Sequence, residues 1–161
     1  MLELRPWTDA AFDILVRANT PEMTEQLGGP ESPEKLLDRH QRYLALTRSG
    51  AAWPMQLVVD DVPVGSFGYW QHDDWFEAGW AVLPEFQGRG YAKAGVLALL
   101  QHAKANGSHE RLHAVTRVTN TASNAIASSL GFTLLNTAPM EYPAGHFSLS
   151  NVWAFELRQL S

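Results

Sequence analysis

The sequence contains no cysteine among its 161 residues. This absence excludes disulfide bridges, thiolate nucleophiles and cysteine-based metal sites, and it fits a reducing compartment. No apolar run approaches the ~20 residues that a membrane-spanning helix needs. The first residues also lack the basic segment and apolar core of a secretory signal. We therefore expect a cytoplasmic protein without a membrane partner.

Positive charge is also scarce. The chain has 12 Lys and Arg against 17 Asp and Glu, a net charge of −5 with neutral histidines. A nucleic-acid partner is disfavoured, because phosphate binding needs clustered basic side chains. An acidic surface would instead suit a cationic substrate. The 45% hydrophobic content allows a sizeable core, and we expect residues 1–161 to form a single domain.

A strand, a turn and the beginning of a helix follow one another in the middle of the sequence. Residues 80–83 are apolar and suit a buried strand, which Pro84 should end because proline cannot donate to a strand ladder. Residues 87–90 form a glycine-rich turn. Apolar side chains then recur at helical spacing on one face, which predicts a helix over about 90–105.

The junction between this turn and the helix has the chemistry of an anion site. The first N–H groups of a helix lack partners within it, and the helix dipole adds roughly half a positive charge there. Gly88, Gly90 and Ala92 leave room for an anion, and Arg89 adds a formal charge. We therefore predict a phosphate-binding turn. It is neither a dinucleotide-binding fingerprint, because Lys93 replaces the third glycine, nor a P-loop. A purely structural turn is the alternative.

Two motifs resemble those of the GCN5-related N-acetyltransferase (GNAT) superfamily. Residues 87–92, with the sequence QGRGYA, resemble its acetyl-coenzyme A loop, whose signature is Gln/Arg-x-x-Gly-x-Gly/Ala. Residues 120–132 resemble its second hallmark, Asn-x-x-Ser followed by a helix and Leu-Gly-Phe. Residues 4–9 and 26–30 also resemble the RimJ/RimL-type branch, so the resemblance covers nearly the whole chain.

This resemblance implies a mixed α/β protein with the GNAT-like fold, in which helices flank a central, mostly antiparallel sheet. It implies acetyl transfer from acetyl-CoA to a primary amine, by direct attack in a ternary complex and without a metal. Characterised relatives acetylate protein N-termini and others modify small amines, so the acceptor class stays open, as does a homodimer. The residues implied at the cofactor are Leu83, Gln87, Gly88, Arg89, Gly90, Tyr91, Ala92, Lys93, Asn120 and Ser123.

The chemistry of this transfer assigns further roles. An amine must lose its proton before it attacks a thioester, which costs on the order of 4 kcal/mol at neutral pH. Glu77 stands where relatives often carry a glutamate, and we expect it to be the general base, with a solvated strand-end carboxylate as the alternative. The resemblance implies the backbone N–H of Val82 as the oxyanion donor. Many relatives place a tyrosine seven residues after the motif asparagine, but this chain has Ala127 there, so the general acid is unassigned.

The hydrophobic pattern predicts a strand, two helices, a three-stranded meander, a helix, a strand, a helix and two strands. We expect Thr8 or Asp9 to cap a helix over residues 11–18, and Ser32 to cap a second helix that ends at Ser49. The apolar face of the first helix should contain Phe12, Leu15 and Val16. The expected strands cover residues 2–7, 53–59, 62–70, 75–83, 111–118, 132–135 and 152–157.

The acceptor pocket should be formed by the variable segments, about residues 20–48 and 138–148, and residues 20–33 should be mostly loop. His40 either packs in the core or lines this pocket, and Trp75 could border it. The motif Asn120 and Ser123 could equally be an N-cap and a surface hydroxyl. Two other functions stay open: a non-catalytic acyl-CoA-binding sensor or interaction module, and an unrelated nucleotide-binding domain.

Overall fold

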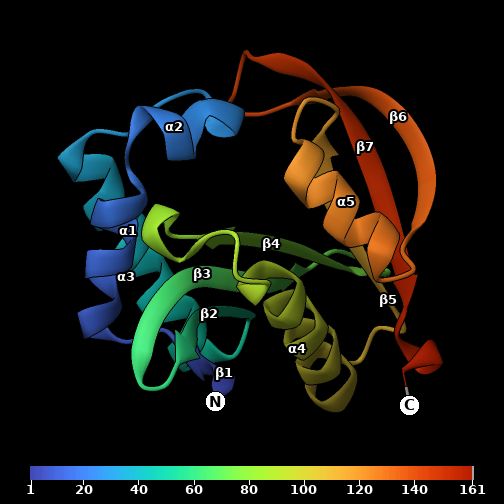
Figure 1. Ribbon diagram of the computed structural model, residues 1–161, viewed down its shortest axis with the longest axis horizontal. Coiled ribbons are helices and arrows are strands. Elements are labelled where there is room, and N and C mark those ends of the chain that lie inside the picture. Colours follow the sequence, from blue (N-terminus) through green and yellow to red (C-terminus); the bar gives the residue numbers. More distant parts are fainter. Residues whose placement is uncertain (161) are drawn as a thin grey trace.

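The computed structural model describes residues 1–160, which form one seven-stranded sheet with the order β1-β2-β3-β4-β5-β7-β6 (Figure 1). All neighbouring strands are antiparallel except β4 and β5, which are parallel. The expected mixed, mostly antiparallel sheet is confirmed. Its strands are β1 (Leu2–Pro6), β2 (Ala52–Val59), β3 (Val62–Gln71), β4 (Phe76–Val82), β5 (Arg111–Arg117), β6 (Thr133–Glu141) and β7 (Phe147–Glu156).

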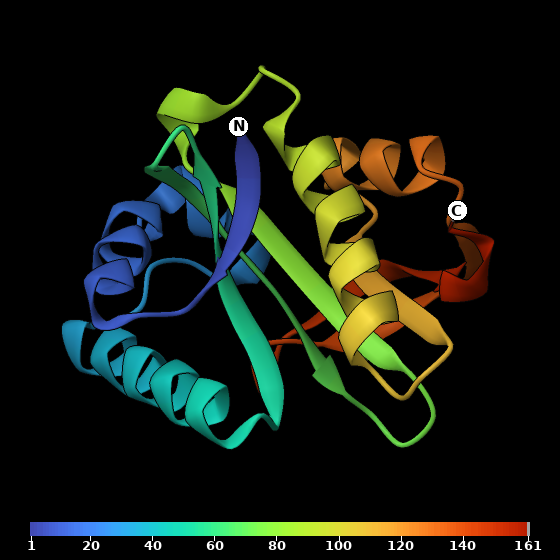
Figure 2. The ribbon, with the colours of Figure 1, turned by 90° about the horizontal axis from the view of Figure 1, so that it is seen from below.

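Helices cover both faces of the sheet. Figure 2 shows α4 on one side of the central strands, and α1 and α3 on the other. The larger apolar core lies under α4, whose residues Val96, Leu99 and Leu100 are fully buried against the strands. A smaller core around Trp7 lies between α1 and α3. The helices are α1 (Phe12–Ala18), α2 (Pro21–Thr24), α3 (Pro33–Ser49), α4 (Tyr91–Asn106) and α5 (Thr121–Ser129).

The ends of α3 follow the sequence signals. The side chain of Ser32 accepts a hydrogen bond from the N–H of Lys35 at 3.3 Å, and Pro33 occupies the first helical position. Gly50 ends the helix with a φ of +71°, a left-handed conformation that glycine adopts without steric cost. The predicted bounds of this helix are therefore confirmed, together with the physical reason for each end.

The start of the first helix differs from the expectation. The chain enters α1 through a 3₁₀ turn, Asp9–Ala11, and neither Thr8 nor Asp9 accepts a capping hydrogen bond through its side chain. A carboxylate oxygen of Asp9 instead lies 3.1 Å from Nε2 of His40. The expected cap was wrong because this side chain is used in a contact with α3, which local sequence does not reveal.

The apolar face of α1 was also predicted incorrectly at one position. Val16 is exposed, whereas Ile14 is buried. The residues that pack inward follow the i, i+3, i+4, i+7 spacing of a single helical face, and this spacing leaves Val16 on the solvent side. They are Ala11, Ile14, Leu15 and Ala18.

The C-terminal strands are longer than the pattern predicted. β6 and β7 form a hairpin, and both extend beyond the predicted residues 132–135 and 152–157 into the variable segment 138–148. β6 is an edge strand, exposed along nearly its whole length, and it therefore lacks the apolar alternation by which a half-buried strand is recognised. Its bounds are set by its pairing with β7.

Two further observations complete the fold. Residues 20–33 were expected to be mostly loop, but their first half contains α2 followed by a 3₁₀ turn, Glu25–Leu27. The side chain of Thr20 caps α2 by accepting a hydrogen bond from Met23 N at 3.2 Å. Within residues 1–160, every helix is too short or too polar to cross a membrane.

Candidate active site

The candidate site is the cleft between β4 and β5. These strands pair only between Phe76–Ala78 and Leu112–Ala114. Beyond Ala78, β4 continues along β3 whereas β5 continues along β7, so their facing edges separate. Within the described chain, residues 79–82 therefore have no partner strand on the β5 side. This separation leaves an opening between the two diverging strands.

The backbone of Val82 points into this opening. The N–H of the next residue, Leu83, donates to the carbonyl of Val64 at 2.8 Å, which places it on the β3 side. Since the N–H groups of successive strand residues point to opposite edges, the N–H of Val82 points towards β5. On that same edge, the Val82 carbonyl accepts a hydrogen bond from Nε2 of Gln87 at 2.9 Å. The orientation is the one that an oxyanion donor needs.

The glycine-rich turn leads directly into α4. Gly88 and Gly90 have φ angles of +76° and +81°, and a Cβ atom built on either would meet nothing within 4 Å. The first helical N–H to be paired is that of Ala94, which donates to the carbonyl of Gly90 at 3.2 Å. No side chain caps the helix and no acidic residue occupies its first turn. The N–H groups of residues 91–93 therefore face an open, positively polarised space, with the exposed side chain of Arg89 beside it.

Two residues expected at the cofactor also hold this turn in place. Leu83 is buried, with its N–H bound to Val64 and its carbonyl accepting from the N–H of Phe86 at 2.9 Å. The side-chain amide of Gln87 ties the turn to the end of β4 through Val82. The N–H of Leu83 is consequently not free for a ligand, and both residues position the turn relative to the strand.

Glu77 lies near the start of β4, where the strand still pairs with β5. Its carboxylate is half-buried, and one oxygen lies 3.1 Å from Nε2 of His72. Burial raises the pKa of Glu77 above its ordinary value, while His72 opposes the rise. A carboxylate with a raised pKa, lining a cleft, is suited to accept a proton from an amine.

Aromatic stacking holds the loop that carries His72. Trp75 lies between the rings of His72 and His113, with centroid distances of 5.2 and 4.8 Å. Nε2 of His109 also lies 3.1 Å from the carbonyl oxygen of His72. Trp75 therefore supports the Glu77 contact and is not among the residues that line the cleft, so the suggestion that it borders the acceptor pocket was wrong.

His40 is packed in the core. Its ring is buried, and its Nδ1 accepts a hydrogen bond from Nε1 of Trp7 at 3.0 Å. Of the two interpretations of this histidine, the structural one is confirmed. The ring helps to join α3 to the N-terminal segment, because it also stacks on Phe12 at a centroid distance of 4.9 Å.

The second motif lies at the start of α5. The side chain of Asn120 accepts a hydrogen bond from the N–H of Ser123 at 3.2 Å and so caps the helix, and both residues line the cleft. The cap explains the asparagine locally, and it leaves the side-chain amide nitrogen available to a ligand. Ala127 is completely buried and its methyl side chain has no proton to donate, so this position supplies no general acid.

The cleft has a volume of about 850 Å³, within the ~300–1,000 Å³ usual for small-molecule sites. Its floor consists of small residues that lie opposite one another, Gly68 against Gly79 and Ser66 against Ala81. Glycines inside strands often mark close approach of a ligand or another backbone. Gly68 and Gly79 were therefore a signal in the sequence that the sequence analysis did not use.

The variable segments form the walls of the cleft, as expected. Residues from α3 and the preceding turn face residues from the β6–β7 hairpin. Figure 1 shows the segment after α2 beside the turn between β6 and β7, and Gly28 and Pro143 approach closely there. The lining residues of these walls include Gln26, Leu27, Arg39, Arg42, Tyr43, Met140, Glu141, Tyr142 and Ser148.

Two cleft residues left no recognisable signal in the sequence. The guanidinium of Arg117, at the end of β5, donates to the carbonyl of Glu25 at 3.3 Å and to that of Tyr142 at 3.2 Å. It thus joins the two walls. Nε1 of Trp80 is buried and, within residues 1–160, has no hydrogen-bond partner. A buried unpaired donor in a cleft fits a site that receives a polar ligand.

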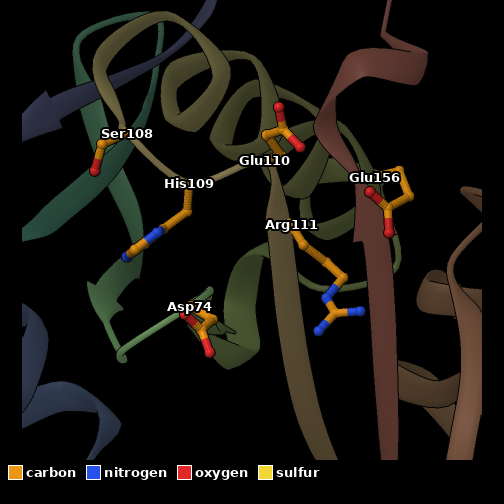
Figure 3. A pocket seen from close by; sticks show the side chains of 6 residues that line it. All are labelled: Asp74, Ser108, His109, Glu110, Arg111 and Glu156. Atoms are coloured by element: carbon orange, nitrogen blue, oxygen red, sulfur yellow. The ribbon is translucent and has the colours of Figure 1, made fainter.

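A second hollow lies at the opposite end of β5 (Figure 3). Arg111 and Glu156 come from the paired strands β5 and β7, and Asp74 lies across the hollow from them. The described residues contain no group of three or more side chains arranged to hold a metal ion. None of the residues expected at the site belongs to this hollow.

Comparison with known families gives a match to one model. The model described as an acetyltransferase (GNAT) domain matches residues 1–133. A search of curated protein sequences gave no match.

Solved structures resemble the whole chain. An acetyltransferase from Salmonella typhimurium, described as modifying the N-terminal serine of the 50S ribosomal subunit protein L7/L12, has 25% identity and a TM-score of 0.83, over 96% of this chain and 94% of that one. RimL, a ribosomal L7/L12 alpha-N-protein acetyltransferase in complex with coenzyme A, has 25% identity and a TM-score of 0.83, over 96% and 93%. Spermidine N-acetyltransferase from Vibrio cholerae, with CoA and spermine, shares the fold at 14% identity, with a TM-score of 0.84 over 98% and 96%.

Proposed function

The chain belongs to the GNAT acetyltransferase family, and from this premise we propose how its residues carry out the transfer of an acetyl group from acetyl-CoA to an amine. The amine attacks the thioester directly while both substrates are bound in the cleft between β4 and β5. Acceptors of the similar proteins include a protein N-terminus and spermidine, and we propose a primary amine of one of these kinds here. The non-catalytic alternative is not favoured, because the matched family is one of enzymes.

One observation carries the proposal: the divergence of β4 from β5 ends at the open glycine turn. A diphosphate fits this turn because Gly88 and Gly90 offer space where a side chain would intrude, and because the N–H groups of residues 91–93 are unpaired. Acetyl-CoA supplies the activated acetyl group. The chain would hold its diphosphate at the turn and its thioester arm along the free edge of β4, past Val82.

The three reacting parts are then arranged along one strand. The N–H of Val82 would donate to the thioester carbonyl oxygen as negative charge develops on it. Glu77 lies closer to the start of β4 and faces the same cleft, roughly 16 Å along the strand from Val82, so it would accept the proton of the amine through water. With Ala127 buried, the departing thiolate leaves without a tyrosine acid, which a thiol pKa near 8.5 on the cysteine scale permits.

A direct experiment follows thiol release from acetyl-CoA with a panel of primary amines, together with calorimetry of CoA binding. We expect CoA to bind wild-type protein and at least one peptide or small amine to accelerate thiol release. A charged or bulky residue in place of Gly88 should abolish binding. Binding that survives Gly88→Asp unchanged would show that the diphosphate does not lie at this turn.

A further inference from the structure

One basic side chain in the cleft lacks a counterion. Of the three arginines that line it, Arg39 is paired with Glu31 through two hydrogen bonds of 2.9 Å. Arg42 is exposed and lies over the ring of Tyr43. Arg117 is half-buried, and within residues 1–160 no carboxylate oxygen lies within 4.0 Å of its nitrogens. The chain is acidic overall, but its described residues leave this half-buried positive charge to a ligand of the cleft.

Uncharged groups hold the guanidinium of Arg117 in place. Its Nη1 donates to the carbonyl of Glu25 at 3.3 Å, and its Nη2 donates to the carbonyl of Tyr142 at 3.2 Å. These contacts use two of its five N–H donors, so three donors remain for a ligand. A planar guanidinium that is fixed in position and keeps donors to spare is suited to bind a carboxylate.

Arg117 lies level with the place where the amine reacts. β4 and β5 are in register at Ala78 and Ala114, and three residues further along each strand come Ala81 and Arg117. The proposed oxyanion donor, the N–H of Val82, directly follows Ala81. A nitrogen that attacks the thioester approaches its carbonyl carbon to within ~3–3.5 Å. The position of Arg117 along the sheet therefore matches that of the attacking amine.

The side chain of Arg117 also faces away from the helix at the glycine turn. Glu77 is in register with His113, and Arg117 follows His113 by four residues, so all three side chains point to one face of the sheet. Phe76, the residue before Glu77, is buried in the core under α4, so this face is the opposite one. The register partner of Arg117 on β7 is Ser150, which lines the cleft. An anion bound by Arg117 therefore belongs to the acceptor and not to the diphosphate.

The cleft is closed just beyond this guanidinium. Residues 25–28 cross its end: the hydroxyl of Thr119 donates to the side-chain oxygen of Gln26 at 3.1 Å, and a Cβ atom built on Gly28 would lie 2.8 Å from Cδ of Pro143. Figure 1 shows this segment beside the turn between β6 and β7. A polypeptide whose amine reacts at this level must extend in the other direction, so its later side chains lie away from the guanidinium. Only a group next to the amine reaches it.

We infer that the acceptor is a small primary amine, a free α-amino acid with an apolar side chain, and that Arg117 binds its carboxylate. This carboxylate is attached to the carbon that bears the amine. A peptide N-terminus has an uncharged amide in that place, and a polyamine has no anion. The walls favour an apolar side chain, since Leu27, Leu46 and Met140 line them. The inference rests on the proposed function, because it takes the N–H of Val82 as the donor to the thioester carbonyl.

The groups already assigned balance the reaction. The bound ammonium loses one proton through water to Glu77, and the neutral nitrogen forms a bond to the acetyl carbon as the C–S bond of acetyl-CoA breaks. The second proton of the nitrogen ends on the departing thiolate. The products are an N-acetyl amino acid and CoA. Arg117 orients the amine through its carboxylate and takes no part in the changes of bonding.

Four acceptors test the inference in one assay of thiol release: leucine, leucinamide, 3-methylbutylamine and the dipeptide amide Asp-Leu. The first three share a side chain and differ only in the group next to the amine, which is a carboxylate, a neutral amide or hydrogen. Rates are expressed per concentration of neutral amine, so that differences in amine pKa do not enter. We expect kcat/KM for leucine to exceed the values for leucinamide and 3-methylbutylamine about tenfold or more. Equal values, or a higher value for the dipeptide amide, would overturn the inference.

Variants test whether Arg117 binds the carboxylate. Arg117→Gln should remove most of the preference by raising KM for leucine, with kcat/KM for 3-methylbutylamine changed no more than about twofold. Arg117→Lys keeps the charge without the planar fork, so it should retain part of the preference. CoA affinity should be unchanged in both variants. If Arg117 only bridges the walls, all acceptors should lose kcat/KM alike, and that result would refute the assignment.

Arg111→Gln is the matched control. Arg111 lies on the same strand and the same face, six residues before Arg117, in the hollow of Figure 3 and outside the cleft. This variant should keep the full preference for leucine. A preference lost equally in Arg111→Gln, or lost in Arg42→Gln and kept in Arg117→Gln, would show that another group binds the carboxylate.

Failure of the proposed function is distinguishable from failure of this inference. If no amine in the assay releases thiol, acetyl transfer to these acceptors fails, and calorimetry of leucine and 3-methylbutylamine on CoA-loaded protein decides the inference. Tighter binding of leucine, lost in Arg117→Gln, would support it. Equal or absent binding of the two amines would refute it whether or not thiol is released.

Discussion

The two halves of the cleft are built in different ways. The half that we assign to acetyl-CoA consists mainly of one continuous stretch, from the end of β4 through the glycine turn into α4, whose geometry comes from backbone groups. Asn120 and Ser123, at the start of α5, are its proposed contribution from a second segment. The half that we assign to the acceptor brings together α3, the turn after α2 and the β6–β7 hairpin, which are far apart in sequence. Local backbone chemistry leaves motifs, whereas side chains that meet only after folding do not.

This difference suggests that the two halves can be disturbed separately. Variants of the turn should change the affinity for CoA, and variants of the walls should change the choice of acceptor. Only Glu77, which faces the cleft near the start of the opening, should alter the rate for bound substrates. A variant that changes the CoA affinity, the choice of acceptor and the rate for bound substrates together would show that the two halves are coupled.

The largest effect is expected at Glu77. Glu77→Gln keeps the shape of the side chain but cannot accept a proton, so kcat should fall about 100-fold or more. CoA affinity by calorimetry should stay within about twofold of wild type, because the carboxylate lies away from the glycine turn. Glu85→Gln is the control: this carboxylate lies on the surface after β4, paired with Arg17, and its loss should leave kcat unchanged. Full activity in Glu77→Gln would remove the assignment of the base.

The next effect concerns the turn itself. Gly90→Ala forces a left-handed residue with a side chain, which should cost about 1 kcal/mol of stability and lower CoA affinity about tenfold. Gly50→Ala introduces the same strain at the end of α3, where φ is +71° and the surroundings are equally open. It should lower the melting temperature similarly without changing CoA affinity. Equal losses of affinity in the two variants would mean that general destabilisation, not the turn, is responsible.

The parts of the molecule that could be predicted follow the same division. The strand–turn–helix and the cap at Ser32 were recognisable because each depends on a few adjacent residues. β6 was underestimated because an exposed edge strand has no apolar alternation. The pairing of Asp9 with His40 and the bridge made by Arg117 could not be seen, since both depend on contacts between distant segments.

The pH dependence should identify the group that assists the base. Burial raises the pKa of Glu77 above its ordinary value, and the carboxylate must be ionised to accept a proton. Activity should therefore fall as the pH is lowered through this raised pKa. His72 opposes the rise, so His72→Gln should move the acidic limb of kcat/KM to higher pH. At neutral pH the loss should be only a few-fold.

The control for this shift is chosen from the surrounding titratable groups. His113 is the register partner of Glu77 on β5, and His109 contacts the carbonyl of His72. His146, in the β6–β7 turn, is exposed and lies outside the cleft lining, so His146→Gln should leave the profile unchanged. An acidic limb that does not move in His72→Gln would show that the contact between His72 and Glu77 has no influence on the proton acceptor.

The smallest expected effect separates the two roles of Asn120. Its side-chain oxygen caps α5, and we propose that its amide also contacts the cofactor. Asn120→Ala removes both contacts and should cost about 1 kcal/mol of stability, with CoA affinity reduced about threefold. Asn120→Ser keeps an oxygen able to cap the helix but has no amide. It should retain the stability and still lose the affinity.

Ser32→Ala is the control for this comparison. It also removes a side-chain cap from a helix, here α3, but on the face of the sheet opposite to α4. Its stability should fall about as much as that of Asn120→Ala, roughly 1 kcal/mol, with CoA affinity unchanged. If Asn120→Ser binds CoA as tightly as wild type, the asparagine is only a cap. The second motif would then belong to the scaffold, and the cofactor half of the cleft would consist of the glycine turn and the free edge of β4.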